Sequence, residues 1–169
     1  MLIGNPDKFA FLLEIVPEWS DDTFINGMLY VFINGAQYPK TLRTTTLSDD
    51  IYYLVDNSSF IHPKVNDELF SLDAKTLFEK LCEITFPPAM EDNNDFDYLI
   101  PLTELASEKY QIYIVSSKMS IKILVGHYID NDQIYFDDEV SMGLEEFEVI
   151  KQKMQNYYLN HLIDFQLSR

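Results

Sequence analysis

The 169-residue sequence predicts an α+β fold, in which helices pack on one face of a largely antiparallel β-sheet. Three observations indicate this fold: segments that alternate as strands do, a middle region with helical spacing of apolar residues, and a long amphipathic segment near the C-terminal end. The elements follow the order strands, two helices, more strands and a closing helix. Because no internal repeat or linker divides them, we expect residues 1–169 to form a single domain.

Aromatic and branched residues predict N-terminal strands near residues 8–16, 28–33 and 36–43. The Asn34-Gly35 pair between the last two is a strong signal for a two-residue hairpin, because such a turn needs positive φ at both positions. We therefore expect the chain to open with antiparallel strands.

Helices are predicted in the middle of the chain and at its end. Ser48 is the expected N-cap of a short helix with acidic residues in its first turn. Asp73 is the expected N-cap of a second helix, in which apolar residues recur at three- and four-residue steps until Pro87-Pro88 ends it. The long C-terminal helix, from about Leu144 to Phe165, has the same spacing and should pack across the sheet.

Two later segments, "SIKILVGHYI" from residue 120 and "QIYFDDEV" from residue 133, alternate as strands and are joined by the turn residues 130–132. If Ile134, Phe136 and Val140 face the core, the residues between them face outward: Gln133, Tyr135, Asp137 and Glu139. The second strand of this hairpin is therefore predicted to expose its acidic side chains.

Acidic residues dominate the charge of the sequence, whose net charge is −16. Residues 123–150 contain eight Asp or Glu, residues 81–108 contain seven, and neither window contains Lys or Arg. A field of one sign repels nucleic acid and anionic membranes and attracts basic proteins. We therefore expect a basic protein partner, and neither nucleic acid nor a membrane.

Metal binding is not expected, although the stretch "DNDQIYFDDE" from residue 130 begins as a calcium loop does. An EF-hand loop needs Gly at its sixth position and Glu at its twelfth, where this sequence has Tyr135 and Ser141. The sequence predicts no metal site and no cofactor.

Catalysis is not expected either, because no motif of a known catalytic or phosphate-binding site is present. The histidines are far apart, and His127 follows the alternation of a buried strand, which favours a place in the core or at its edge. Cys82 lies on an apolar helix face and is expected to be a buried, inert thiol. We predict no catalytic residue and no enzyme.

A cytoplasmic location is expected from the single cysteine, which permits no intrachain disulfide. The N-terminal apolar run ends at Glu14 and is too short for a secretory signal, and no run approaches the length of a membrane span.

We interpret the acidic windows, residues 81–108 and 123–150, as a partner-binding surface. Aromatic residues are enriched at binding hot spots, and charge complementarity speeds association. A solvated acidic face that only prevents aggregation is the alternative. The predicted partner-binding residues are Asp130, Asp132, Tyr135, Asp137, Asp138, Glu139, Glu145, Glu146, Asp92 and Asp95.

The N-terminal half also resembles a known family. The resembling residues are Pro17-Glu18-Trp19-Ser20, Asn26-Gly27, Asn34-Gly35, Tyr38-Pro39 and Arg43-Thr44-Thr45-Thr46-Leu47. They are similar to the opening of the bacterial immunity protein family numbered forty-two, whose members are antidotes in polymorphic toxin and contact-dependent growth inhibition systems. The resemblance implies a cytoplasmic protein that binds the C-terminal domain of a cognate toxin. Trp19 is interpreted as a core anchor.

The resulting hypothesis is an immunity protein that blocks a basic toxin domain, in particular a nuclease. Two alternatives stay open: an acidic regulatory module that mimics DNA, and a hydrolase that uses a pair of carboxylates. The sequence carries no signal for the oligomeric state.

Overall fold

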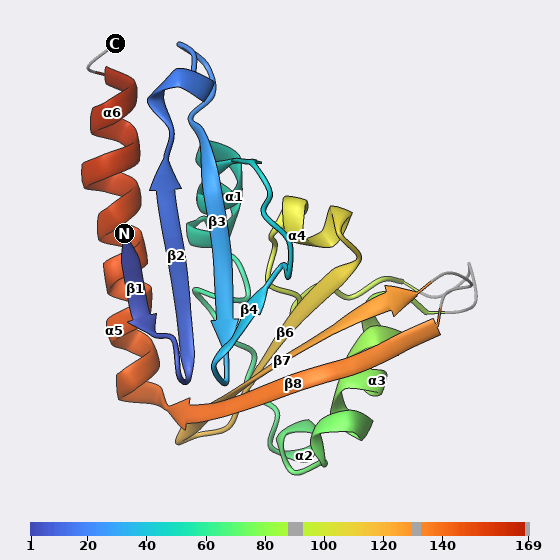
Figure 1. Cartoon of the computed structure of the whole chain (residues 1–169). Coiled ribbons are helices and arrows are strands. Elements are labelled where there is room, and N and C mark those ends of the chain that lie inside the picture. Colours follow the sequence, from blue (N-terminus) through green and yellow to red (C-terminus); the bar gives the residue numbers. More distant parts are fainter. Residues whose placement is uncertain (88–92, 130–132, 168–169) are drawn as a thin grey trace.

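Two antiparallel β-sheets form the centre of the fold, and helices lie around them (Figure 1). The computed structural model describes residues 1–87, 93–129 and 133–167. Sheet A contains β1 (Leu2–Asn5), β2 (Phe9–Ile15), β3 (Asn26–Ile33), β4 (Ala36–Tyr38) and β5 (Thr45–Thr46). Sheet B contains β6 (Tyr110–Ser116), β7 (Ser120–Ile129) and β8 (Gln133–Gly143). The predicted α+β class is confirmed, with two sheets in place of the one expected.

Sheet A is built on hairpins, as its sequence predicts. Asn34 and Gly35 have φ of 51° and 81°, and they close the β3–β4 hairpin at the expected place. β4 ends at Tyr38, well before the predicted residue 43, because Pro39 has no N–H with which to extend the ladder. β1, which pairs with β2, was not predicted from the sequence.

Sheet B is buried on both faces, and this is the main difference from the predicted architecture. Ile112, Ile114 and Ile123 point into a large core shared with sheet A. Tyr113 and Leu124 point the other way, into a second core formed with a helix behind the sheet. β6 and the middle of β7 therefore read as nearly continuous apolar runs, because neither face of these segments meets water.

A register shift between Val125 and Gly126 changes which side chains of β8 face each core. Phe136 pairs with Gly126 and Asp138 with Val125, so Asp137 is the extra residue of a β-bulge. Ile134 and Phe136 consequently pack into the second core, whereas Val140 and Met142 pack into the first. The predicted simple alternation from Ile134 to Val140 is therefore wrong, because the bulge reverses the faces.

The helices surround these sheets: α1 (Leu47–Val55), α2 (Asp67–Phe70), α3 (Ala74–Thr85), α4 (Thr103–Ser107), α5 (Leu144–Tyr157) and α6 (Ile163–Leu167). α3 lies behind sheet B, and α5 runs alongside β1 at the edge of sheet A (Figure 1). A short 3₁₀ helix, Pro17–Trp19, connects β2 to β3. The predicted long C-terminal helix is confirmed, with a π-helical turn at Tyr158–Leu162 between α5 and α6.

The helix caps test the local predictions. Asp73 caps α3 as expected, since its Oδ1 accepts a 3.1 Å hydrogen bond from the amide of Thr76. Hydrogen bonding with the side chain of Thr76, and then with this amide, lowers the pKa of the Asp73 carboxyl. Ser48 does not cap α1: the N-cap is Thr46, and Ser48 Oγ accepts from the amide of Ile25 at 3.3 Å instead. Pairing of β3 with β5 therefore sets the start of α1.

Asp50 is a buried carboxylate that ties α1 to its neighbours. Its Oδ1 accepts hydrogen bonds from the amide of Thr103 at 2.8 Å and from Thr103 Oγ1 at 2.6 Å, and its Oδ2 accepts one from Thr45 Oγ1. Three donors thereby replace the water that this charge would otherwise need.

Substitution of Asp50 by Ala is expected to lower the free energy of unfolding by about 2–4 kcal/mol, because the donors of Thr45 and Thr103 lose a charged acceptor. Urea denaturation measures this change. The matched control is Asp49→Ala on the exposed side of the same helix turn, which should cost no more than about 1 kcal/mol. Equal effects of the two variants would contradict the structural role of Asp50.

Substitution of Gly126 by Ala is expected to destabilise the protein by about 1–3 kcal/mol, because a Cβ there would overlap the carbonyl of Tyr135 and the ring of Phe78. Gly143 is the control, since a Cβ at that position meets no atom within 4 Å and Gly143→Ala should change stability by less than about 1 kcal/mol. Thermal unfolding of both variants provides the comparison.

Candidate functional site

The bulge of β8 holds two of the predicted acidic residues. Asp137 Oδ2 is joined to His127 Nδ1 by a 2.7 Å hydrogen bond, and Asp138 Oδ1 accepts a 3.1 Å hydrogen bond from the side-chain amide of Asn34. Asn34 belongs to the β3–β4 turn, so the tip of this hairpin meets the bulge. Neither carboxylate forms an ion pair with Lys or Arg within the described part of the chain.

A row of aromatic rings beside these carboxylates crosses sheet B and ends on β4 of sheet A. The rings of Tyr135 and His127 are stacked with centroids 5.8 Å apart, those of His127 and Tyr110 are 5.7 Å apart, and those of Tyr110 and Tyr38 are 5.5 Å apart. We call Tyr135, His127, Tyr110 and Tyr38 the aromatic row. Tyr135 is 44% exposed at one end of it, and Tyr38 is buried at the other.

Burial and the carboxylates both affect the tyrosines of the aromatic row. Burial, followed by the charges of Asp137 and Asp138, raises the pKa of Tyr38. Burial and then Asp137 raise the pKa of Tyr110 as well. His127 was expected in the core or at its edge, and its half-buried place in the row confirms the edge. The row and its acids thus combine apolar area with negative charge.

Glu139 does not join this surface, because its side of β8 faces the second core. Its Oε2 is buried and has no hydrogen-bond partner among the residues that the structure describes. The expectation that Glu139 points outward with Asp137 is wrong, and the bulge is the reason.

Glu145 and Glu146 lie at the start of α5, beyond the opposite end of β8. Six residues separate Asp137 from Gly143, or about 20 Å of strand. Lys8 Nζ binds Glu146 at 3.0 Å, whereas the exposed Glu145 has no cationic partner among the residues placed here. Both carboxylates stabilise the positive N-terminal end of the helix.

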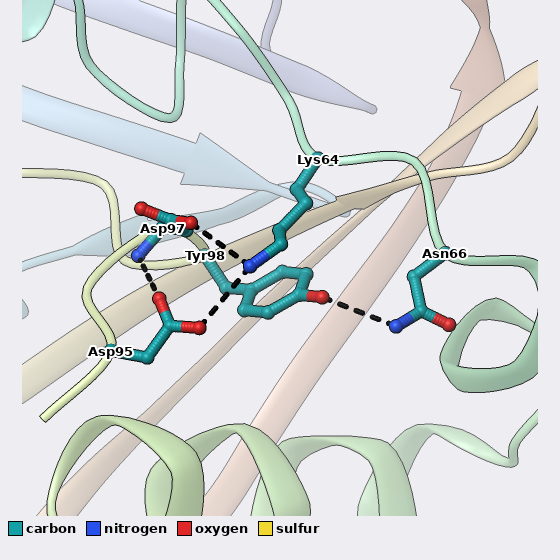
Figure 2. Close-up of polar contacts among 5 residues, drawn as sticks. All are labelled: Lys64, Asn66, Asp95, Asp97 and Tyr98. Carbon is teal, nitrogen blue, oxygen red and sulfur yellow. Dashed lines mark hydrogen bonds and ion pairs between the residues drawn. The ribbon is translucent and has the colours of Figure 1, made fainter. Parts of the chain in front are cut away.

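Asp95 belongs to a separate cluster on the side of sheet B that α3 covers. Figure 2 shows Lys64 Nζ between Asp95 Oδ2 at 3.2 Å and Asp97 Oδ2 at 2.9 Å, with the ring of Tyr98 beside it. Asn66 donates a 3.2 Å hydrogen bond to the hydroxyl of Tyr98. The bond to Asp97 is the main cause of the raised pKa of Lys64. Asp95 is therefore paired and lies away from the aromatic row.

Three of the predicted partner-binding residues, Asp92, Asp130 and Asp132, lie outside the described residues. For the rest, cations distant in sequence reach the acidic windows: Lys8 reaches Glu146, Lys64 reaches Asp95, and Arg43 reaches Glu108. The windows without basic residues are thus partly neutralised by the fold. Of the predicted partner-binding residues, Asp137, Asp138, Glu139 and Glu145 have no Lys or Arg partner among the described residues, and Glu139 is the one of them that faces the second core.

The structure contains an open hollow of about 460 Å³ that was not predicted from the sequence. It is lined by Trp19, Asn26, Thr44, Thr45, Thr46 and Glu104. The interpretation of Trp19 as a core anchor is wrong, because Trp19 is 47% exposed at the rim of this hollow. The polar residues around it, from Glu18 to Asp22, were the available signal, since a core residue is usually flanked by apolar ones in a periodic pattern.

A second hollow, of about 430 Å³, lies between α1 and the C-terminal helix. It is lined by Tyr52, Val55, Asp56, Gln155, Asn156, Tyr158 and Leu159. Each of the two hollows is lined by a single carboxylate. Neither offers the pair of carboxylates that the hydrolase hypothesis needs. Asp50 and Glu104 together line a third cavity, but its volume is only about 10 Å³ and Asp50 is held there by Thr45 and Thr103.

Within residues 1–87, 93–129 and 133–167, no group of three His, Cys, Asp or Glu side chains is arranged to hold a metal ion. Every helix placed in the structure is too short or too polar to span a bilayer.

Comparison with known proteins places the chain in a class of immunity proteins. The chain belongs to the family described as Immunity protein 42, whose sequence profile matches residues 1–157. The resemblance seen in the N-terminal motifs is thereby confirmed. No curated protein matches the chain.

A crystal structure described as CdiI from Burkholderia dolosa AUO158 has a similar fold. The two chains share 28% sequence identity and superpose with a TM-score of 0.74. The match covers 92% of this chain and 98% of the other. The similarity therefore extends over nearly the whole length of both chains.

Cys82 is buried as predicted, and burial raises the pKa of its thiol to about 11. At pH 8 only about one molecule in a thousand should carry the reactive thiolate, against roughly a quarter for an ordinary thiol. The native protein should therefore react with Ellman's reagent at least about 100-fold more slowly at pH 8 than the protein unfolded in guanidinium. Absorbance of the released chromophore measures both rates, and a fast native reaction would contradict the burial.

Proposed function

We propose that this immunity protein binds and blocks the C-terminal domain of a cognate toxin in the cytoplasm. The toxin would belong to a contact-dependent growth inhibition or polymorphic toxin system, be basic, and cleave nucleic acid. The family, the similarity to CdiI and the net charge of −16 support this proposal. The protein would act without a cofactor or a catalytic step of its own.

The mechanism proposed is occlusion. Asp137 and Asp138 take the place of the phosphates in the groove of the toxin, and the exposed ring of Tyr135 supplies apolar contact area. The observation that carries this proposal is an exposed tyrosine stacked on His127 beside two carboxylates that no Lys or Arg of the described chain neutralises.

Other predicted residues take different parts in this proposal. Glu145 and Glu146 extend the contact toward α5, and Asp130 and Asp132 remain contacts proposed from sequence alone. Asp92 likewise remains a contact proposed from sequence alone. Asp95 and Glu139 have no part in the central contact, because Asp95 is held by Lys64 and Glu139 faces the second core.

The direct test is protection. The toxin domain encoded beside this gene is expressed in a sensitive strain with and without the immunity protein, and the two purified proteins are mixed and chromatographed. Survival and co-elution are expected. Binding to several unrelated basic proteins instead of one toxin would favour a DNA-mimic module, and failure to protect would reject the proposal.

Neutralisation of Asp137, Asp138 and Glu145 together (Asp137→Asn, Asp138→Asn, Glu145→Gln) is expected to slow association with the toxin roughly tenfold at low salt and to reduce its salt dependence. Stopped-flow or surface plasmon resonance measures the association rate constant across ionic strengths.

The matched control neutralises three exposed acids on α2 and α3, namely Glu68→Gln, Glu79→Gln and Glu83→Gln. It changes the net charge by the same amount and should leave the association rate within about twofold of the original. If both triple variants slow association equally, net charge alone steers the toxin and the surface at the bulge is rejected.

A further inference from the structure

The hollow beside Trp19 is assembled from four segments that are distant in sequence. Trp19 comes from the 3₁₀ helix, Asn26 from the start of β3, Thr45 and Thr46 from β5, and Glu104 from α4. Five of its six lining residues belong to the motifs that carry the family resemblance. Those motifs therefore converge on a surface feature and do not only build the core.

Hydrogen bonds hold the backbone at Trp19 in place. The side-chain amide of Asn26 donates to the Trp19 carbonyl at 2.6 Å, and the Trp19 amide donates to the Val16 carbonyl at 3.0 Å. Ser20 Oγ accepts from the Asn26 amide at 2.9 Å and donates to the Val16 carbonyl at 3.0 Å. The indole is thus presented to solvent from a fixed turn, so little conformational entropy is lost when a partner contacts it.

Glu104 supplies the charge of the hollow. Its carboxylate is exposed and forms no hydrogen bond or ion pair with any residue placed in the structure. Arg43, which lines the small adjoining cavity together with Glu104, is already bound by Glu108. Asp50, on the inner side, is already bound by Thr45 and Thr103. The negative charge at Glu104 is therefore available to a cation from outside.

The second hollow differs in this respect. Its carboxylate, Asp56, is already hydrogen-bonded to Tyr52, an interaction that raises the pKa of Tyr52. A polarisable aromatic face together with an unpaired carboxylate is a combination that suits a cationic side chain, because the ring attracts the cation and the carboxylate pairs with it. Of the two hollows, the one beside Trp19 combines an aromatic face with an unpaired carboxylate.

We propose that the hollow beside Trp19 receives a lysine or arginine side chain of the toxin. The indole of Trp19 would pack on the apolar stem and charged group of that side chain, and the carboxylate of Glu104 would form an ion pair with it. This inference rests on the proposed function and adds a second contact, separate from the aromatic row. The net charge of −16 and the basic partner that it favours make a cation the complementary occupant.

A double-mutant cycle tests whether the two residues share one cation. Trp19→Ala and Glu104→Gln are each expected to weaken binding of the adjacent-gene toxin domain roughly tenfold, as removal of a hot-spot contact does. The double variant should lose clearly less than the product of the two factors, because either single change already disrupts the shared contact. Isothermal titration calorimetry gives the three dissociation constants. Trp19→Phe, which keeps an aromatic face, should recover part of the affinity.

The controls are Tyr53→Ala, an aromatic residue exposed to a similar extent, and Glu79→Gln, an exposed acid on α3. Both should bind as the original protein does. Trp19 is the single tryptophan of the chain, so 5-fluorotryptophan labelling gives one ¹⁹F signal that reports on the hollow. That signal should shift when unlabelled toxin is added.

The outcomes separate the two proposals. If the original protein binds and protects but Trp19→Ala and Glu104→Gln bind equally well, or if their effects are additive, the shared cation is rejected and the immunity function stands. If the original protein neither binds nor protects, the proposed function fails and this inference falls with it. Circular dichroism of each variant verifies that a loss of affinity is not a loss of fold.

Discussion

The burial of sheet B on both faces is the constraint on which the rest of the structure depends. β6 beyond Tyr110 and the middle of β7 send side chains into two cores at once, so these segments have no polar face with which to meet a partner. β8, at one edge of the sheet, combines core packing with exposed charge, and the bulge at Asp137 allows it to do so. The chemistry of the surface is thereby confined to this edge, to the hairpin tips and to the connecting loops.

Charge pairing follows from the same arrangement. With a net charge of −16, repulsion between carboxylates opposes the compact state. Lys8, Arg43 and Lys64 relieve part of this repulsion by joining segments that are distant in sequence. Exposed pairs of this kind contribute little stability, about 0–1 kcal/mol each. Their larger effect is to determine which carboxylates stay free, and therefore where a basic partner meets uncompensated charge.

Local signals in the sequence predicted local structure well. Asp73, the Asn34-Gly35 turn and the spacing of the C-terminal helix each act through neighbours in the chain, so α3, the β3–β4 hairpin and α5 were found. The second sheet face, the bulge and the cations at the acidic windows depend on residues far apart in sequence, which no local pattern records. The prediction for Trp19 was wrong for a related reason. Its large apolar ring suggested burial, whereas pairing of β3 with β5 creates an open hollow beside it.

The two proposed contact regions are linked by the fold. Tyr110 belongs to the aromatic row, and Glu108, two residues earlier, binds Arg43, which adjoins the hollow at Thr44. A partner that contacted both the aromatic row and the hollow beside Trp19 would be held at two points. A basic protein whose cations have a different spacing would contact only one of these regions. Such a requirement separates a cognate toxin from other basic proteins, which uniform acidity cannot do, because a diffuse field attracts all of them alike.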